Sequence, residues 1–453
     1  MRVFYGWWIV LAAFLNLFFA VGIVYYGFPA FYPSMVNSLG FTRAQLTQGF
    51  LVGFVGAGLL FGLLSGVLID SLGSRLVIRI GIWFVGLPLI LMGCVTHLWQ
   101  YYVFCIVEVV GYVLAGPIPN QVLVSNWFCL KRGRAMGIAY LGLGVGGAIS
   151  PLLITRLIQS LGWRHAFQVI GALILIVLFP VSQWITRSSP RDLNILPDGI
   201  TPVGVANEPA SSDRGSMSGV GVARAVRSAN FWLIVAGSTF AIGAIGAVTQ
   251  HLILFLIGEG YSLSKASRVL SALLVSSLMG RVIVGYFADR YNRKNVMALF
   301  YLLLALAIPL LFVVPKPGAV WGFALLFGFA MGADYMLIPL VTADCFGLSS
   351  LGKLLSLIIT GYSVGQWFAP WLAGRIFDTQ HRYDLAWLIM SAAAAVGAAL
   401  IYAVKPDRPD AHTPVGVQLM AETRNGPIQA GRGNLRSQSS RYSFIRASSF
   451  RSR

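Results

Sequence analysis

Charged residues are scarce in this chain. Only 11% of its 453 residues are Asp, Glu, Lys or Arg, whereas 57% are apolar. A soluble domain carries about 25% charged residues, so this composition excludes a soluble globular protein of this length. Cysteine is scarce too, and Cys94, Cys105, Cys129 and Cys345 show neither metal-ligand spacing nor an obvious pairing across a loop. We therefore expect no metal, no other cofactor and no disulfide framework.

Long apolar runs recur along almost the whole chain. About 20 apolar residues are needed for a helix to cross the hydrocarbon core of a membrane. The runs are continuously apolar rather than alternating, which excludes membrane-spanning strands. The sequence therefore predicts an all-α membrane protein of about twelve spanning helices. They are expected near residues 6–31, 47–69, 77–96, 101–125, 136–157, 166–186, 231–257, 267–288, 296–314, 319–342, 355–377 and 385–404.

Acidic residues are the scarcer charged class, with 15 acids against 33 Lys and Arg and a net charge of +18. A basic surplus of this size can indicate nucleic-acid binding, depending on where the charges lie in the sequence. The segments between spans hold 24 Lys and Arg in one alternating set and 8 in the other. Because cytoplasmic loops carry the basic excess, we expect both termini in the cytoplasm and no nucleic-acid partner. The expected location is the cell membrane, either a plasma membrane or a bacterial inner membrane, with multiple passes.

Two polar stretches divide the chain. Residues 188–229 are rich in Gly, Ser and Pro and are expected to be a cytoplasmic linker between six-helix bundles at 1–187 and 230–404. The basic tail, residues 405–453, is expected to be disordered and attracted to anionic lipid. Regulation by serine phosphorylation is the alternative role for this tail.

The two predicted bundles repeat one pattern at a constant offset of 219 residues. A duplicated unit of this kind is common in transport proteins, which place their substrate site between the halves near the membrane midplane. The matching pairs are Gly66 and Gly285, Asp70 and Asp289, Arg75 and Lys294, Arg134 and Lys353, Gly142 and Gly361, Gly146 and Gly365, and Pro151 and Pro370.

Several of these residues carry a family resemblance. The segment GVLIDSLGSR at 66–75 resembles the loop between helices two and three of the major facilitator superfamily, and GYFADRYNRK at 285–294 resembles its second-half echo. The resemblance covers roughly residues 5–404. The segments YGWW, NWFCLKRGRAMG and MGRVIVG, which begin at Tyr5, Asn126 and Met279, are similar to the monocarboxylate porter and oxalate–formate antiporter branch. The resemblance implies a twelve-helix fold in two halves and transport by alternating access.

The repeated loops suggest a cytoplasmic gate. Asp70 and Asp289 end helices on the predicted cytoplasmic side, where a carboxylate can face the positive N-terminus of a neighbouring helix. Arg75, Arg134 and Arg290 are expected to complete a charge cluster that opens when the halves rock. Simple positive-inside anchoring is the alternative reading of the arginines.

Arg281 lies inside a predicted span, one turn before Gly285 and within otherwise uncharged sequence. An arginine in the membrane core costs roughly 2.5–3.5 kcal/mol on insertion scales. The repeat does not require it, because its partner at the 219 offset is Gly62. A guanidinium binds a carboxylate through two parallel hydrogen bonds, so we expect Arg281 to hold the substrate, as the resemblance to the carboxylate-transporting branch also implies. The alternative is a structural ion pair with Asp334 or Glu108.

Other polar side chains within the spans complete the predicted site. Asp334 in helix ten and Glu108 in helix four are expected to be counter-ions for Arg281 or carriers of a co-transported proton. For Glu108, which lies beside closely packing glycines, a structural role is the favoured alternative. Each remaining candidate is also compatible with a packing role. The predicted substrate contacts besides Arg281 are His251, Tyr26, Asn120 and Gln366.

The chain also departs from the pattern of the branch it resembles. Ala30 follows Phe28-Pro29 where animal monocarboxylate members have a lysine, and Ser277 stands where they have an aspartate. Both groups are tied to proton coupling in those members, so that route is not expected here. Helix eleven lacks the internal lysine of the oxalate exchangers, with Lys353 only at its end. One intramembrane cation favours a monoanion over a dianion.

These observations predict a secondary active transporter of a small organic monocarboxylate, with a proton as the candidate co-substrate. No ATP-binding motif is present, so an ion or substrate gradient is the expected driving force. The alternatives are an exporter of amphipathic drugs or other organic solutes, and a transporter-like carboxylate receptor that signals through the basic tail. An enzyme is not expected, because the sequence shows no nucleophile–base pair.

Overall fold

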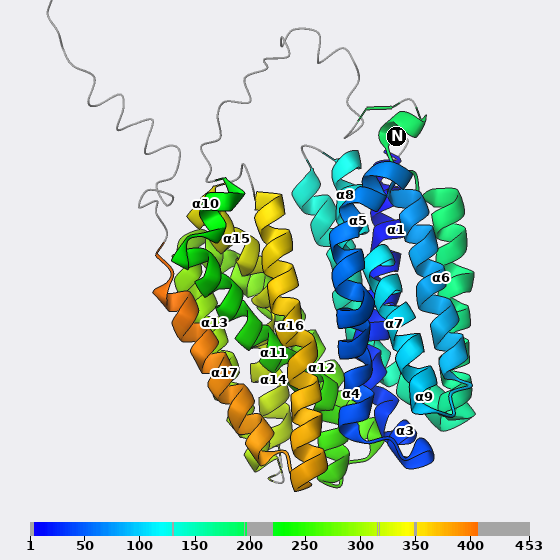
Figure 1. Ribbon diagram of the computed structural model, residues 1–453, viewed down its shortest axis with the longest axis vertical. Coiled ribbons are helices and arrows are strands. Elements are labelled where there is room, and N and C mark those ends of the chain that lie inside the picture. The colour runs from blue at the N-terminus through cyan, green and yellow to red at the C-terminus, as the bar shows by residue number, and fades with distance from the viewer. Residues whose placement is uncertain are drawn as a thin grey trace, which may run out of the picture. The chain divides into compact units, whose positions relative to one another are not determined.

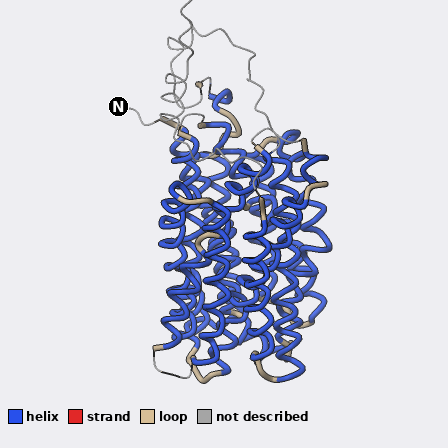
Figure 2. The backbone as a smooth tube through the Cα atoms, turned by 90° about the vertical axis from the view of Figure 1, so that its left-hand side faces the viewer, coloured by secondary structure: helices blue, strands red, loops and turns tan. Residues whose placement is uncertain are grey.

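The structure is a computed structural model that describes residues 4–128, 131–193, 195–196, 221–314, 316, 318–347 and 351–405. Within these ranges every regular element is a helix, and Figure 2 shows the helices running side by side along the long axis. The predicted all-α membrane fold is therefore confirmed. The centre of the predicted linker, residues 197–220, and the tail from residue 406 lie outside the described residues.

The helices of residues 6–185 form one group, here called the first half (Figure 1, blue to green). Its elements are α1 (Gly6–Asn16), η1 (Leu17–Ile23), α2 (Val24–Gly27), η2 (Phe28–Ala30), α3 (Tyr32–Leu39), α4 (Arg43–Gly53), η3 (Phe54–Gly58), α5 (Leu59–Leu72), α6 (Ser74–Met92), α7 (Leu98–Ala115), α8 (Pro117–Trp127), α9 (Arg132–Pro180) and η4 (Val181–Ile185). The long helix α9 reverses at Gly162, whose φ is +78°. It therefore supplies two crossings rather than one.

The helices of residues 222–403 form the second half (Figure 1, green to orange). Its elements are α10 (Val222–Val226), α11 (Ala229–Gly258), α12 (Leu263–Arg290), α13 (Arg293–Ala307), η8 (Ile308–Val313), α14 (Ala319–Met331), α15 (Asp334–Phe346), α16 (Leu351–Gln380) and α17 (Asp384–Ala403), and a short turn, η5 (Pro190–Leu193), precedes them. The span expected at 319–342 is thus broken between α14 and α15, next to Gly332.

Eight described segments are long and apolar enough to cross a membrane by length and composition. One of them, 134–185, contains the reversal at Gly162, and shorter apolar helices such as α14 pair up to complete further crossings. The end of the bundle at which α1 begins and α17 finishes is called the terminal end, and the opposite end is called the distal end (Figure 1).

Side-chain caps fix where several helices begin. The Thr42 hydroxyl accepts from the backbone N–H of Gln45, and the Gln45 side chain accepts from the backbone N–H of Thr42, which starts α4 with a capping box. The Ser228 hydroxyl caps α11 in the same position, and Ser262 caps α12. Each cap satisfies N–H groups that have no partner within their own helix.

The repeated glycines allow close packing of helix on helix. A Cβ atom added at Gly142 would lie 2.2 Å from the carbonyl oxygen of Phe14. One added at Gly365 would lie 2.2 Å from the carbonyl oxygen of Thr239. A close approach of a glycine to a main-chain carbonyl thus joins α9 to α1 in the first half and α16 to α11 in the second. Small residues permit such backbone approach, so these glycines are packing positions.

Candidate functional site

The two halves meet through two pairs of helices on the distal side. Helix α4 packs against α16, and α9 packs against α12. In the first seam the Thr47 hydroxyl donates to the carbonyl oxygen of Pro370 at 3.3 Å. In the second seam the hydroxyls of Thr155 and Ser267 lie 2.6 Å apart. All four residues lie in the distal parts of their helices, so the halves are closed against each other there.

A small pocket lies where the halves meet. Its lining comes from α2 in the first half and from α11, α12, α14 and α16 in the second. The lining residues are Tyr25, Tyr26, Ile242, Ile245, Gly246, Thr249, Arg281, Met331 and Gln366. Three of the five predicted substrate contacts, Arg281, Tyr26 and Gln366, are thus brought together.

Arg281 enters this pocket from the middle of α12. Close approach of α12 to the end of α14 holds it there, because a Cβ at Gly332 would lie 2.7 Å from the backbone nitrogen of Arg281. Among the described lining residues Arg281 is the one cation, and no acid accompanies it. Within the described lining, the guanidinium therefore faces apolar and uncharged polar groups.

Hydrogen bonds cross between the halves at the edge of the pocket. The Gln366 side-chain amide donates to the Tyr25 hydroxyl at 3.1 Å. The Gln250 amide donates to the backbone carbonyl of Tyr25 at 3.4 Å and accepts from the Tyr32 hydroxyl at 3.0 Å. Tyr25 also packs edge-on against Trp367. The first crossing is therefore tied to α11 and α16 at the depth of the pocket.

The other two predicted contacts, Asn120 and His251, are buried outside the pocket lining. The Asn120 amide donates to the backbone carbonyls of Ala115 and Gly116, and its oxygen accepts from Asn16. These bonds satisfy carbonyls at the break between α7 and α8. In this conformation Asn120 supports a helix break and does not face the pocket.

His251 forms two hydrogen bonds on the distal side of the pocket. Its Nδ1 lies 2.9 Å from the Tyr383 hydroxyl, and its Nε2 lies 2.8 Å from the carbonyl oxygen of Pro370. Both ring nitrogens are therefore engaged by the second half itself. Burial raises the pKa of the Tyr383 hydroxyl above its usual value, so the group stays protonated as a hydrogen-bond partner.

The two predicted intramembrane acids differ in what the structure describes. Glu108 on α7 is 1% exposed, and neither of its carboxylate oxygens has a hydrogen-bond partner among the described residues. An ion pair between Glu108 and Arg281 is therefore not formed in this conformation. Asp334 begins α15, but its side chain lies outside the described residues. The predicted pairing of Asp334 with Arg281 thus stays a prediction.

The predicted gate residues gather at the terminal end. Asp70 lies in the last turn of α5 and Asp289 in the last turn of α12, although their side chains lie outside the described residues. Arg134 is exposed near the start of α9. The guanidinium of Arg290 lies 4.3 Å from the ring centre of Tyr286, its neighbour one turn back on α12. A contact of this kind within one helix anchors the side chain locally.

Arg75 and its repeat partner Lys294 cap helix ends in their own halves. Arg75 donates to the carbonyl oxygens of Ser182 and Gln183 at the end of the sixth crossing. Lys294 donates to the carbonyl oxygens of Tyr402, at 3.1 Å, and Val404, at 2.6 Å, at the end of α17. Gln183 and Tyr402 are themselves 219 residues apart, so the duplication preserves the contact and not only the residues.

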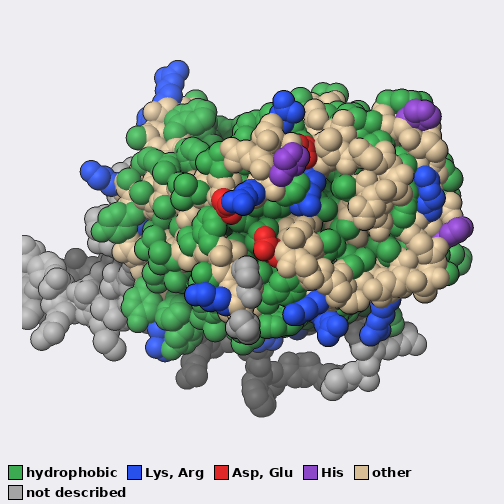
Figure 3. All heavy atoms as spheres, turned by 90° about the horizontal axis from the view of Figure 1, so that it is seen from below, with side chains coloured by type: hydrophobic (Ala, Val, Ile, Leu, Met, Phe, Trp, Pro, Cys, Tyr) green, Lys and Arg blue, Asp and Glu red, His purple; other side chains and the backbone are tan. Residues whose placement is uncertain are grey.

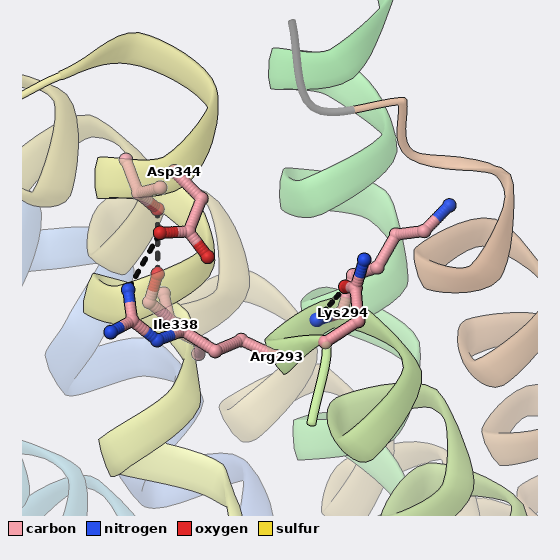
Figure 4. A network of polar contacts seen from close by, with 6 residues as sticks. Arg293, Lys294, Ile338 and Asp344 are labelled. Carbon is pink, nitrogen blue, oxygen red and sulfur yellow. Dashed lines mark hydrogen bonds and ion pairs between the residues drawn. The ribbon is translucent and has the colours of Figure 1, made fainter. Parts of the chain in front are cut away.

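A close ion pair lies beside this cap in the second half. Arg293 donates to Asp344 on α15 at 2.6 Å. Figure 4 shows Arg293 reaching toward Asp344, whereas the neighbouring Lys294 points the other way. The start of α13 is thus fixed to α15 on one side and to the end of α17 on the other. Such ties favour movement of the second half as one body.

Sequence reasoning missed the apolar wall of the pocket. Ile242, Ile245 and Met331 look like any other apolar residues of a membrane span. The Thr249 hydroxyl lines the pocket while donating to carbonyls of its own helix. Positions 242, 245, 246 and 249 have helical spacing and therefore lie on one face of α11. This spacing was the one sequence feature that could have indicated the pocket wall.

Comparison with known families identifies a family that matches most of the chain. A family model described as Major Facilitator Superfamily matches residues 13–332 and, in a second match, residues 260–448. Together these matches extend over both halves of the described structure.

Individual relatives are similar at low identity. The chain is 25% identical over 306 residues to the MFS-type transporter pytF of Aspergillus terreus, covering 64% of this chain and 91% of that protein. It is 24% identical over 349 residues to human monocarboxylate transporter 12, covering 72% of this chain and 66% of that protein. It is 26% identical over 351 residues to the probable transporter MCH2 of Saccharomyces cerevisiae, covering 77% and 70%.

Solved structures share the fold. A D-xylose–proton symporter superposes with a TM-score of 0.67 at 18% identity, covering 89% of this chain and 99% of that chain. The nucleoside transporter NupG gives a TM-score of 0.67 at 15% identity, covering 88% and 98%. These neighbours carry different solutes. Their similarity therefore establishes the architecture, and the substrate has to be inferred from the residues that line the pocket.

Proposed function

The chain belongs to the Major Facilitator Superfamily, and from that premise we propose that it is a secondary active transporter of small organic monocarboxylates. It is a multi-pass membrane transporter rather than an enzyme. The observation that carries the substrate class is the position of Arg281 in a pocket between the halves. The name of human monocarboxylate transporter 12 supports the same class.

The lining of the pocket favours a monoanion with an apolar body. A guanidinium offers a carboxylate two parallel hydrogen bonds, and Arg281 is the cation available among the described lining residues. Ile242, Ile245 and Met331 offer apolar contact to the rest of the molecule. A dicarboxylate would place its second charge against these side chains without a partner, which costs free energy. Dicarboxylates are therefore expected to bind more weakly.

The contacts between the halves support a mechanism of alternating access. The seams close the distal end, and the predicted topology makes that end extracellular and the terminal end cytoplasmic. In this conformation the pocket is then shielded from outside. Substrate released from Arg281 would leave toward the cytoplasm, and rocking of the halves would expose the pocket to the other side. The predicted gate contacts at the terminal end would form in that second state.

Glu108 is our candidate for the coupled proton. A buried ionised carboxylate without hydrogen-bond partners is costly, so the protonated form is favoured in this conformation. Replacing Glu108 with Gln mimics that form permanently. We expect the Glu108→Gln protein to exchange substrate across the membrane while losing acceleration by a proton gradient. Retained acceleration would assign the coupling to another group, with Asp334 next in line.

The test is uptake by the purified full chain in proteoliposomes. A panel of labelled solutes should include aliphatic and aromatic monocarboxylates, their amides, dicarboxylates and amphipathic cations. We expect saturable uptake of monocarboxylates, rejection of the amides and weak uptake of dicarboxylates. Transport of amphipathic cations alone would favour the drug-exporter alternative. Specific carboxylate binding without any uptake would favour a receptor.

A labelling experiment tests the proposed orientation. Single cysteines placed in the 188–229 linker and in the 405–453 tail should react only with reagents that reach the cytoplasm. The expectation rests on the excess of Lys and Arg on that side, 24 against 8. Reaction with an impermeant external reagent at either place would reverse the orientation.

A further inference from the structure

A cluster at the distal end joins α4 of the first half to α16 of the second. The Asp378 carboxylate accepts the backbone N–H of Arg43 at 3.2 Å through one oxygen and the N–H of Ala44 at 3.0 Å through the other. These are the first two N–H groups of α4, which have no partner within the helix. A carboxylate from the opposite half thus occupies the positive end of α4.

The Arg43 side chain adds a second set of contacts across the same seam. Its guanidinium carbon lies 3.6 Å from the ring centre of Phe377. Its Nη1 donates to the Tyr383 hydroxyl at 3.0 Å and to the carbonyl oxygen of Leu254 at 3.2 Å. One arginine of the first half therefore contacts α11, α16 and the start of α17. In Figure 3, which views the distal face, side chains fill the middle of that face, with basic and acidic groups close together.

His251 positions the two second-half residues of this cluster, Tyr383 and Pro370, that accept hydrogen bonds from α4. It bonds the Tyr383 hydroxyl through one nitrogen and the Pro370 carbonyl through the other. Thr47 of α4 donates to that same Pro370 carbonyl. His251 is fully buried, so it acts through Tyr383 and Pro370 rather than by touching substrate.

Three consecutive residues of α11 connect this cluster to the pocket. Thr249 lines the pocket. Gln250 bonds across the seam to Tyr25, which also lines it. His251 supports the distal cluster. These three residues span less than one helical turn. A shift of α11 on substrate binding would therefore also move the cluster.

The described residues of the second seam, between α9 and α12, form no equivalent cluster. At the 219 offset the partner of Asp378 is the exposed Gln159, whose amide donates to the Ser264 hydroxyl at 2.9 Å. A neutral amide–hydroxyl bond in contact with solvent is weaker than a carboxylate bound to two N–H groups. The charge at Asp378, like that at Arg281, is thus present in only one half.

We propose that Asp378 and Arg43, positioned by Tyr383 and His251, form a latch that holds the distal end closed while the pocket faces the terminal end. The proposal concerns the conformational equilibrium and builds on the alternating-access cycle proposed above. Removal of the latch shifts that equilibrium toward a state open at the distal end, even without substrate. Asp378→Ala is the direct change. Asp384→Ala is its matched control, because Asp384 is an exposed acid at the start of α17, six residues away.

The experiment measures a distance across the distal end in the full chain, in lipid nanodiscs and without substrate. One spin label is placed on the exposed native Cys94 of the first half and the other on Lys316→Cys of the second half. The remaining cysteines are replaced by alanine. Pulsed electron resonance then gives the populations of short and long distances. No transported solute enters the measurement, so its outcome is independent of the substrate assignment.

Asp378→Ala is expected to raise the ratio of long to short distances roughly tenfold over Asp384→Ala, the equivalent of one lost charge-assisted hydrogen bond. His251→Ala, which leaves Asp378 in place, is expected to shift it in the same direction by less. If Asp378→Ala does not fold, Arg43→Gln replaces it, with the same expected direction. Equal distance distributions in the latch variants and in Asp384→Ala would overturn the latch.

Discussion

The first and second halves repeat one framework but differ in where they place charge. Arg75 and Lys294 make the same contact with the end of the last crossing of their own half. Arg281, by contrast, has Gly62 as its partner at the same offset. Positions that match maintain the framework, since the same contact is needed in both halves. Positions that do not match have a task in only one half, and Arg281 lies in the pocket.

Arg281→Lys should give the largest effect on function. Lysine keeps the charge but cannot offer the planar two-point contact to a carboxylate. We expect a loss of roughly 10- to 100-fold in substrate affinity, which corresponds to about 1.5–3 kcal/mol. Gly62→Ala is the matched control at the repeat position, where an added Cβ would meet nothing within 4 Å. Its affinity should remain close to that of the wild type in a direct binding assay.

A double change separates the substrate role of Arg281 from a structural one. If Arg281 serves only to neutralise Asp334, then Arg281→Ala combined with Asp334→Ala should restore expression and much of the uptake. If Arg281 holds the substrate, the double variant should fold but remain inactive. Restored uptake would contradict the proposed comparison, because Arg281 would then maintain the framework of its half.

Asp70→Asn and Asp289→Asn should have a smaller and more symmetric effect. Both residues lie at the terminal end, one in each half, away from the pocket. We expect each change to slow transport while leaving substrate affinity within a few-fold, because a gate affects the rate of conformational exchange. Uptake rates and equilibrium binding measured on the same preparations test this. A large loss of binding by either variant would place that aspartate in the site instead.

Arg75→Ala and Lys294→Ala should change stability and leave binding alone. Each removes a cation bonded to carbonyl oxygens at a helix end, a contact worth roughly 1.5–3 kcal/mol when charge-assisted. Thermal unfolding of the two variants should show similar losses, since the contacts are equivalent. Substrate affinity should not change in either. A loss of binding in only one of them would show that the two caps are not equivalent.

Much of the architecture was predictable from the sequence. Apolar runs of membrane-spanning length predicted the helices, and the family match and fold confirm them. The isolated charge of Arg281 predicted a residue that the structure places in the pocket. The break between α14 and α15 next to Gly332 was not predicted. The apolar run continues through it, and apolar composition does not show where a helix ends.

The latch and the roles of Asn120 and His251 depend on contacts between distant segments. Asn120 bonds carbonyls freed by the break after Ala115, which a list of polar residues within spans does not show. His251 meets a tyrosine 132 residues later. Asp378 near the end of a span reads as an ordinary loop acid until α4 is placed beside it. The one available signal was its mismatch with Gln159 in the repeat.

The caps made by Arg75 and Lys294 also bear on how the two halves can drift in sequence. Their acceptors are main-chain carbonyls, which every amino acid supplies. The residues that provide those carbonyls, Gln183 and Tyr402, share no side-chain chemistry, although the Tyr402 ring centre also lies 5.5 Å from the Lys294 Nζ. Random substitution should therefore be tolerated at 183, which offers Arg75 only its main-chain carbonyl, and selected against at 75 and 294. A hydrogen bond from a side chain to a main-chain carbonyl depends mainly on the identity of the donor residue. Such a contact can therefore persist while the surrounding sequence diverges.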